Sequence, residues 1–276
     1  GLDFSMDTLL AVTRIKADED FSKALKISLL NCEKRRADID PYDEKLLSDP
    51  NRGHWELWSS DGSEPTYAIE ISEPLIARDP VSDVDRDGII AIDFGTKSTV
   101  VVYQKSSEHT LPMAIGTGRL ADAGRPEHYE NPTVMEFADI GTFLSKYNAR
   151  NGRPETLWET LPISHTAYSD MKNSASRDYY AFFCDLKQWA GEGCYPLRIC
   201  DRAGGEYLLP PYMSGETAEL DPIELYAYYI GLYINNMRNG IFLDYYLSFP
   251  VTFEKSVRER ITASFERGLM TVSYTH

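Results

Sequence analysis

The sequence contains few cysteines and histidines and no long apolar run. It has 4 cysteines and 5 histidines in 276 residues, and no two cysteines lie at the two-residue spacing of a zinc site. We therefore expect no structural zinc, and we interpret all the cysteines as buried free thiols in a reducing compartment: Cys32, Cys184, Cys194 and Cys200. No apolar stretch approaches the roughly 20 residues that a membrane helix needs. The first residues lack the basic and then apolar pattern of a secretory signal, so we expect a cytoplasmic protein.

Positive charge is also in short supply. Lysine and arginine number 28 against 43 aspartates and glutamates, which gives a formal net charge of -15 and an isoelectric point near 4.8. Nucleic acids and anionic membranes bind surfaces with clustered lysine and arginine, so we expect neither as a partner. The length allows a sizeable core and favours one large domain with a smaller appendage.

The most informative feature is the turn Asp93-Phe-Gly-Thr-Lys97, which two apolar stretches flank. Gly95 lacks the Cβ atom that would keep an anion away from the backbone amides. Thr96 and Lys97 add a hydroxyl and a cation. This combination predicts a phosphate-binding turn between two strands. A plain β-hairpin with a polar turn is the alternative that these residues leave open.

The strand before the turn is expected to be central in a sheet. Ile89, Ile90 and Ile92 leave it no polar face. We therefore expect this strand to be buried on both sides, with the carboxylate of Asp93 held at its rim.

Four segments, in order along the chain, resemble the nucleotide-binding domain of the Hsp70 family. The turn is similar to the first phosphate motif of the Hsp70, actin and sugar-kinase superfamily. Residues 130–137, Glu-Asn-Pro-Thr-Val-Met-Glu-Phe, resemble the Hsp70 strand Thr-Pro-Ser-Tyr-Val-Ala-Phe, and residues 185–191, Asp-Leu-Lys-Gln-Trp-Ala-Gly, resemble Asp-Ala-Lys-Arg-Leu-Ile-Gly. Residues 247–269 resemble the segment in which a strand ends in Val-Pro-Ala-Tyr-Phe and a helix follows.

This resemblance implies an α/β fold, the first lobe of an actin-like (ribonuclease H-like) ATPase with a mixed sheet and flanking helices. It implies that Asp93 holds Mg²⁺ through water. It implies that the β- and γ-phosphates of ATP or ADP bind the turn residues Gly95, Thr96, Lys97 and Ser98. Lys97 replaces the threonine common in Hsp70, which leaves the details of metal placement open.

The resemblance also implies roles for residues away from the turn. Lys187 aligns with the lysine that assists hydrolysis. Pro250 and Arg258 align with residues that couple the nucleotide state to the substrate-binding half. The implied parent protein is an ATP-driven chaperone, whose partners would include client polypeptides and co-chaperones.

Helical patterns follow the turn at a distance. Residues 178–190 place apolar and aromatic side chains at helical spacing, with Gly191 positioned to end the helix. Lys187 lies at the border of this stripe, where its stem can cover apolar surface while its ammonium reaches a cleft. Asp221-Pro222-Ile223-Glu224 predicts the capped start of a helix to about Arg238, with half-buried tyrosines.

A strand is predicted over residues 241–249, and Pro250 would end its pairing because proline has no N–H to donate. Structurally, Pro250 and Arg258 could equally be a strand stop and a surface charge.

Two further segments match the opening of a known binding motif but lack a feature that the motif needs. Residues 83–94 have the opening spacing of a calcium loop, but position twelve is Phe94 instead of the closing glutamate, so we interpret the segment as an acidic linker. Residues 116–121 satisfy the dinucleotide pattern Gly-x-Gly-x-x-Ala, but the helix-breaking Asp-Ala-Gly-Arg-Pro follows where a helix should begin.

The chain divides into three parts by this reading. Residues 1–87 form an N-terminal extension of unknown function, expected to be a small α+β segment with an acidic linker. Residues 88–270 form the Hsp70-like lobe, and residues 271–276 resemble a translated sequencing adapter and are expected to be non-native. Since the chain begins with Gly1, we expect it to be a fragment of a longer frame.

The expected function is therefore that of an Hsp70-like ATPase fragment that binds Mg-ATP and is inactive by itself. The second hypothesis is a non-catalytic nucleotide-sensing or scaffold protein with the actin fold. The third is a sugar or acid kinase of the same superfamily.

Overall fold

The computed structural model describes residues 84–106, 109–116, 125–148, 154, 157–192, 195–216, 218–238, 240–249 and 253–273. Residues 1–83, which include most of the expected N-terminal α+β segment, lie outside these ranges. Cys32, Cys194 and Pro250 also lie outside them.

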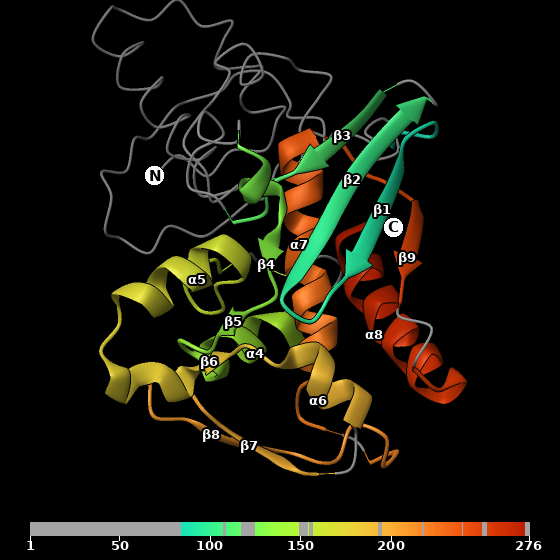
Figure 1. The fold of residues 1–276 in the computed structure, drawn as a ribbon. Helices are drawn as coiled ribbons and strands as arrows, with labels where there is room; N and C mark the ends of the chain where they lie inside the picture. Colours follow the sequence, from blue (N-terminus) through green and yellow to red (C-terminus); the bar gives the residue numbers. More distant parts are fainter. Residues whose placement is uncertain are drawn as a thin grey trace, which may run out of the picture.

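The described chain is a mixed α/β structure (Figure 1). Its strands are β1 (Ile89–Phe94), β2 (Ser98–Ser106), β3 (His109–Met113), β4 (Asn131–Pro132), β5 (Met135–Glu136), β6 (Phe182–Phe183), β7 (Leu197–Cys200), β8 (Glu206–Leu209) and β9 (Asp244–Ser248). Its α-helices are α4 (Ile140–Asn148), α5 (Ser164–Asn173), α6 (Leu186–Glu192), α7 (Pro222–Arg238) and α8 (Lys255–Ser273). Two 3-10 helices, η3 (Pro126–Tyr129) and η4 (Ser176–Ala181), complete the set. None of the helices within the described ranges is long and apolar enough to cross a membrane.

The main sheet is mixed and has the order β3-β2-β1-β9, with β4 paired to β2. β1 and β2 form an antiparallel hairpin in which Phe94 lies opposite Thr99. β9 runs parallel to β1, with Asp93 opposite Ser248. β1 is therefore central by its pairing, as the sequence predicts.

Only one face of β1 is buried, which corrects the expectation that both are. Ile90, Ile92 and Phe94 are at most 1% exposed, whereas Ala91 and Asp93 are exposed. The reason is that α7 and α8 lie against one side of the sheet (Figure 1). The ring of Phe94 meets those of Tyr226 and Phe265, at centroid distances of 5.9 and 5.1 Å.

The long helix α7 begins and ends where the sequence predicts. Asp221 caps it, because Oδ1 accepts the N–H groups of Ile223 and Glu224 at 3.0 and 3.3 Å. Its tyrosines are fully buried and not half-buried as expected, since Tyr226, Tyr228, Tyr229 and Tyr233 are at most 1% exposed. α7 is therefore the central helix of the core.

Residues 178–190 do not form the single helix predicted for them. They divide into η4, the short strand β6 and α6. β6 pairs with β5, and the amide of Phe137 donates to the carbonyl of Ala181 at 2.8 Å, so long-range pairing outweighs the local helical spacing. Gly191 does not end α6 but lies within it, where a Cβ atom would come within 2.8 Å of the ring of Phe253.

The last helix extends past residue 270, where the sequence predicts the lobe to end. α8 continues to Ser273, and Val272 is 1% exposed. The strand predicted over residues 241–249 is shorter than expected, because β9 spans Asp244–Ser248.

Candidate functional site

The turn between β1 and β2 presents its side chains to solvent. Asp93, Thr96 and Lys97 are exposed, and Gly95 and Ser98 are half-buried. A Cβ atom on Gly95 would lie only 2.1 Å from the carbonyl oxygen of Ser98. The tightness of the turn itself therefore requires glycine at this position, whether or not an anion binds.

In the backbone of the turn, three carbonyls are paired, and three amides have no acceptor in the part of the chain that the structure describes. Phe94 O accepts from the Lys187 ammonium, Gly95 O accepts from the Thr133 hydroxyl at 2.9 Å, and Lys97 O accepts from the Thr133 amide at 3.0 Å. In contrast, the amide N–H groups of Gly95, Thr96 and Lys97 have no acceptor among the described residues. Consecutive unpaired amides are the arrangement that binds anions in backbone nests.

Lys187 reaches this turn from α6, which brings together two of the predicted site elements. Its side chain is 3% exposed, and its ammonium lies 5.5 and 5.8 Å from the ring centroids of Phe94 and Phe253. Burial lowers the pKa of Lys187, and the nearby charge of Asp93 partly offsets this shift.

An ammonium has three donors, and within the described part of the chain one of those of Lys187 is used, by Phe94 O. No carboxylate of a described residue lies within ion-pair distance of it. A buried cation without a bonded anion is energetically costly, and such groups are concentrated at functional sites.

Behind the turn lies a group of buried hydroxyls that the sequence analysis did not single out. The hydroxyls of Thr133 and Thr99 are 2.9 Å apart, and the hydroxyl of Tyr226 donates to Thr99 at 3.1 Å. Burial raises the pKa of Tyr226 to about 12, so it stays a neutral donor. Thr133 lies in the segment that resembles an Hsp70 strand, but nothing local in the sequence indicates that it contacts the turn.

Asn131 holds the segment before Thr133 against the sheet. Its side-chain amide donates to the carbonyls of Thr99 and Met113 at 2.9 and 3.0 Å, and its oxygen accepts the amide of Ile115 at 2.6 Å. With all of these groups buried, β4 is fixed firmly beside β2.

A magnesium ion would find one carboxylate at the turn, that of Asp93. Among the residues that the structure describes, no three histidine, cysteine or acidic side chains converge on one point. Mg²⁺ keeps several waters and is commonly held by one or two carboxylates together with substrate phosphates. Asp93 therefore fits a metal that arrives with a phosphate ligand, and it does not form a site for the metal alone.

The predicted coupling pair is only partly placed, because Pro250 lies outside the described residues. Arg258 lies in the first turns of α8, half-buried. It lines an open cavity of about 470 Å³ together with Phe249 and Glu266.

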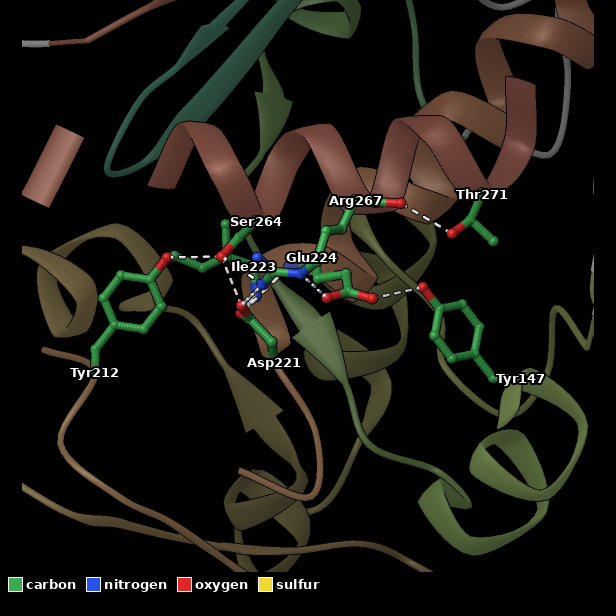
Figure 2. Close-up of polar contacts among 8 residues, drawn as sticks. All are labelled: Tyr147, Tyr212, Asp221, Ile223, Glu224, Ser264, Arg267 and Thr271. Atoms are coloured by element: carbon green, nitrogen blue, oxygen red, sulfur yellow. Dashed lines mark hydrogen bonds and ion pairs between the residues drawn. The ribbon is translucent and has the colours of Figure 1, made fainter. Parts of the chain in front are cut away.

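A second charged cluster lies where α7 begins against α8 (Figure 2). Oδ2 of Asp221 accepts from Ser264 at 2.5 Å and from Arg267 at 2.7 Å. The two oxygens of Glu224 accept from Tyr147 at 2.9 Å and from Arg267 at 2.6 Å. The carboxylate of Glu224 therefore binds side chains of α4 and α8, and among the described residues Asp221 alone provides the side-chain cap of α7.

This cluster borders a cavity of about 310 Å³, which Trp189, Tyr212 and Arg260 also line. Each carboxylate oxygen of Asp221 and Glu224 already has a donor from within the protein. The cluster joins two helices, and we call it the α7–α8 junction.

The thiols are free where the structure describes them, as expected, but they are not both buried. Cys184 is exposed and Cys200 is half-buried, and neither forms a disulfide. The Sγ atom of Cys184 lies 3.6 Å from Sδ of Met171.

No family model matches this sequence, and no curated protein matches it either. The interpretation of the turn therefore depends on its geometry and on the sequence resemblance alone.

Proposed function

We propose that this chain is the first lobe of an Hsp70-like nucleotide-binding domain and that the β1–β2 turn binds the phosphate tail of ATP or ADP. The observation that carries the proposal is the row of amides at Gly95, Thr96 and Lys97, which have no acceptor within the described ranges and lie beside the buried ammonium of Lys187. Unpaired donors that are already in place bind an anion without the cost of rearrangement. The mixed sheet with helices against it is compatible with such a lobe.

In this proposal each residue has a separate task. The amides of the turn and the exposed groups of Thr96 and Lys97 would bind the β- and γ-phosphates. Asp93 would hold Mg²⁺ through water, and the metal would neutralise part of the phosphate charge when bound. The remaining donors of Lys187 would orient a water near the terminal phosphate.

In this proposal the described residues would supply one side of a nucleotide site, and phosphoryl transfer needs charge stabilisation on both sides. We therefore expect weak binding of Mg-ATP, with a dissociation constant of about 0.1–1 mM, and no turnover. Titration calorimetry with Mg-ATP, Mg-ADP and pyrophosphate tests this. Pyrophosphate should compete with ATP, whereas adenosine should not, because the contacts are to phosphate.

A charge-matched pair of variants locates the site. Lys97→Gln should weaken pyrophosphate binding about threefold to tenfold, and Lys105→Gln, at an exposed lysine further along β2, should leave it unchanged. The proposal is overturned if the chain fails to bind pyrophosphate or ATP at about 10 mM, if adenosine alone competes, or if both variants weaken binding equally.

A non-catalytic nucleotide sensor or scaffold is the second candidate. One observation favours it, namely that the Lys187 ammonium is buried and bonded to Phe94 O, where it stabilises the turn. A sensor would bind Mg-ADP and Mg-ATP about equally. Steady release of phosphate from ATP by the purified chain would exclude this candidate.

A further inference from the structure

We propose that Thr133 is the positioning residue that sets the direction of the anion-binding amides in the turn. This inference rests on the proposed function, because it concerns how the same turn is prepared for a phosphate. Thr133 is only 3% exposed, so its polar side chain has its hydrogen-bond partners inside the protein.

Thr133 bonds to the turn twice, through different groups. Its hydroxyl donates to Gly95 O at 2.9 Å, and its amide donates to Lys97 O at 3.0 Å. Both bonds reach across a large separation in sequence, since Gly95 and Thr133 are 38 residues apart. Two anchor points on either side of Thr96 restrict the peptide planes between them.

Peptide planarity turns these two bonds into a direction for the amides. In a trans peptide the C=O and the following N–H point in opposite directions. Because Gly95 O is drawn inward to Thr133, the Thr96 N–H must point away from the core. By the same rule, the bond from Lys187 to Phe94 O turns the Gly95 N–H away from Lys187.

Because residue 95 is a glycine, the turn needs the hydrogen bond from Thr133 to hold its backbone in one orientation. Glycine populates a wide range of backbone angles, so the Gly95–Thr96 peptide is the part of the turn that is most free to rotate. A rotated peptide would present a carbonyl, which repels phosphate, where the amide now lies. The Thr133 hydroxyl stabilises the orientation that attracts an anion.

The anchor is itself supported from the core. The Thr133 hydroxyl lies 2.9 Å from that of Thr99, which in turn accepts from Tyr226 of α7. Thr99 and Tyr226 are both fully buried. A chain of three hydroxyls therefore runs from the central helix to the carbonyl of the turn glycine, and it satisfies each buried group.

The test compares pyrophosphate affinity in variants that differ by a single hydroxyl. Thr133→Val keeps the shape and removes the donor, and it should weaken pyrophosphate binding about tenfold, which corresponds to about 1.4 kcal/mol. Thr133→Ser keeps the donor and should bind within about twofold of the wild type. Tyr226→Phe, at the far end of the chain, should have a smaller effect of about twofold to threefold.

Matched controls separate positioning from a general loss of stability. Thr160 is also buried, but it has no bond to the turn. Its hydroxyl donates to the backbone carbonyl of Leu157 at a distance of 2.8 Å. Thr160→Val should lower the melting temperature about as much as Thr133→Val but leave pyrophosphate affinity unchanged. Tyr229→Phe serves in the same way for Tyr226, because the Tyr229 hydroxyl donates to Leu157 O at 2.7 Å.

The outcomes of this experiment are distinct. Loss of affinity in Thr133→Val with recovery in Thr133→Ser supports the role of Thr133. Unchanged affinity in Thr133→Val overturns this role and leaves the proposed function standing. A wild-type chain that does not bind pyrophosphate overturns the proposed function and this role with it.

Discussion

The β1–β2 turn and the α7–α8 junction both gather polar groups at the end of a secondary-structure element, but only the junction is complete. At the junction, Arg267, Ser264 and Tyr147 supply donors to the carboxylates of Asp221 and Glu224. At the turn, three amides and part of an ammonium have no acceptor among the described residues. A cluster with every group paired stabilises the fold, whereas unpaired donors at an exposed turn are available to a ligand.

The largest expected effect is on the packing of the two helices at the junction. A Cβ atom on Gly268 would lie 2.3 Å from the carbonyl oxygen of Glu224 and 2.8 Å from the amide of Tyr228, both backbone atoms of α7. Gly268→Ala must push α8 away from α7 and should lower the free energy of unfolding by about 3 kcal/mol. Urea denaturation measures this loss.

Gly141, in the first turn of α4, is the matched control. Its Cβ atom would meet nothing closer than the Tyr207 hydroxyl at 3.4 Å. Gly141→Ala should therefore stabilise the protein, by about 0.5–1 kcal/mol. Equal destabilisation by both substitutions would contradict the close contact of α7 with α8.

Glu136 is an intermediate case between the two regions, because it is a buried carboxylate that pairs with Arg202 while the nearby carboxyl of Asp170 favours its protonated form. It is 4% exposed and pairs with Nε of Arg202 at 2.6 Å. Burial raises the pKa of Glu136 to about 7, although Arg202 opposes the shift. Between the ordinary glutamate pKa and 7 the folded state holds a proton that the unfolded state has released, so stability should fall as pH rises through this window.

The loss of unfolding free energy should approach about 3 kcal/mol by pH 7.5 and then level off. Glu136→Gln removes the ionisable group, so its unfolding free energy should vary less with pH between 5 and 7.5. Urea denaturation at a series of pH values distinguishes the two curves. Parallel curves would show that Glu136 is not the titrating group.

The charge network of the junction should contribute a smaller amount. Arg267→Met leaves the carboxylates of Asp221 and Glu224 without their cation and should cost about 1–2 kcal/mol, a value reduced because the Arg267 side chain is 51% exposed. Arg198→Met breaks a pair with Glu206 on β7 and β8 whose two side chains are both exposed, so it should destabilise the protein clearly less than Arg267→Met. Thermal denaturation of the two variants compares their losses of stability. Equal losses would show that Arg267 contributes no more than an ordinary surface ion pair.

Removal of the Lys187 charge at the turn should have a small effect on stability, together with the largest effect on binding. Lys187→Met removes a buried charge, which offsets the lost bond to Phe94 O, so stability should change by less than about 1 kcal/mol. Pyrophosphate binding should fall more than about tenfold, because the anion loses a nearby cation.

Lys172→Met provides the control for this substitution, since Lys172 is exposed and its ammonium lies 4.2 Å from the ring centroid of Tyr168. It should leave binding unchanged. If Lys187→Met unfolds the chain or binds pyrophosphate normally, the turn is a structural element like the junction.

The sequence predicted the parts of this molecule that depend on near neighbours. Asp221 and Pro222 start α7 because a side-chain cap and a preset backbone angle act within one turn of helix. The strand, turn and strand at residues 89–106 follow from apolar runs that a glycine interrupts. The central position of β1 also follows from its apolar character.

Elsewhere local patterns were overruled or contained no signal. The single helix predicted from the spacing of apolar residues at 178–190 was wrong, because β6 pairs with β5, which is distant in sequence. The prediction that both faces of β1 are buried was wrong, because α7 and α8 cover one face only. The bonds from Thr133 to the turn could not be predicted, since a threonine in a short strand has no local mark of its partner.

By itself the sequence determined the helix caps, the tight hairpin and the presence of Asp93, Gly95 and Lys97 on one turn. The tertiary structure decided which donors of that turn lack an acceptor among the described residues. Gly95 O is paired with Thr133, 38 residues away, and Phe94 O with Lys187, 93 residues away, and these bonds set the direction of the amides that follow. Capping and periodicity act over a few residues, whereas these hydrogen bonds exist only after the core has packed and brought distant segments together.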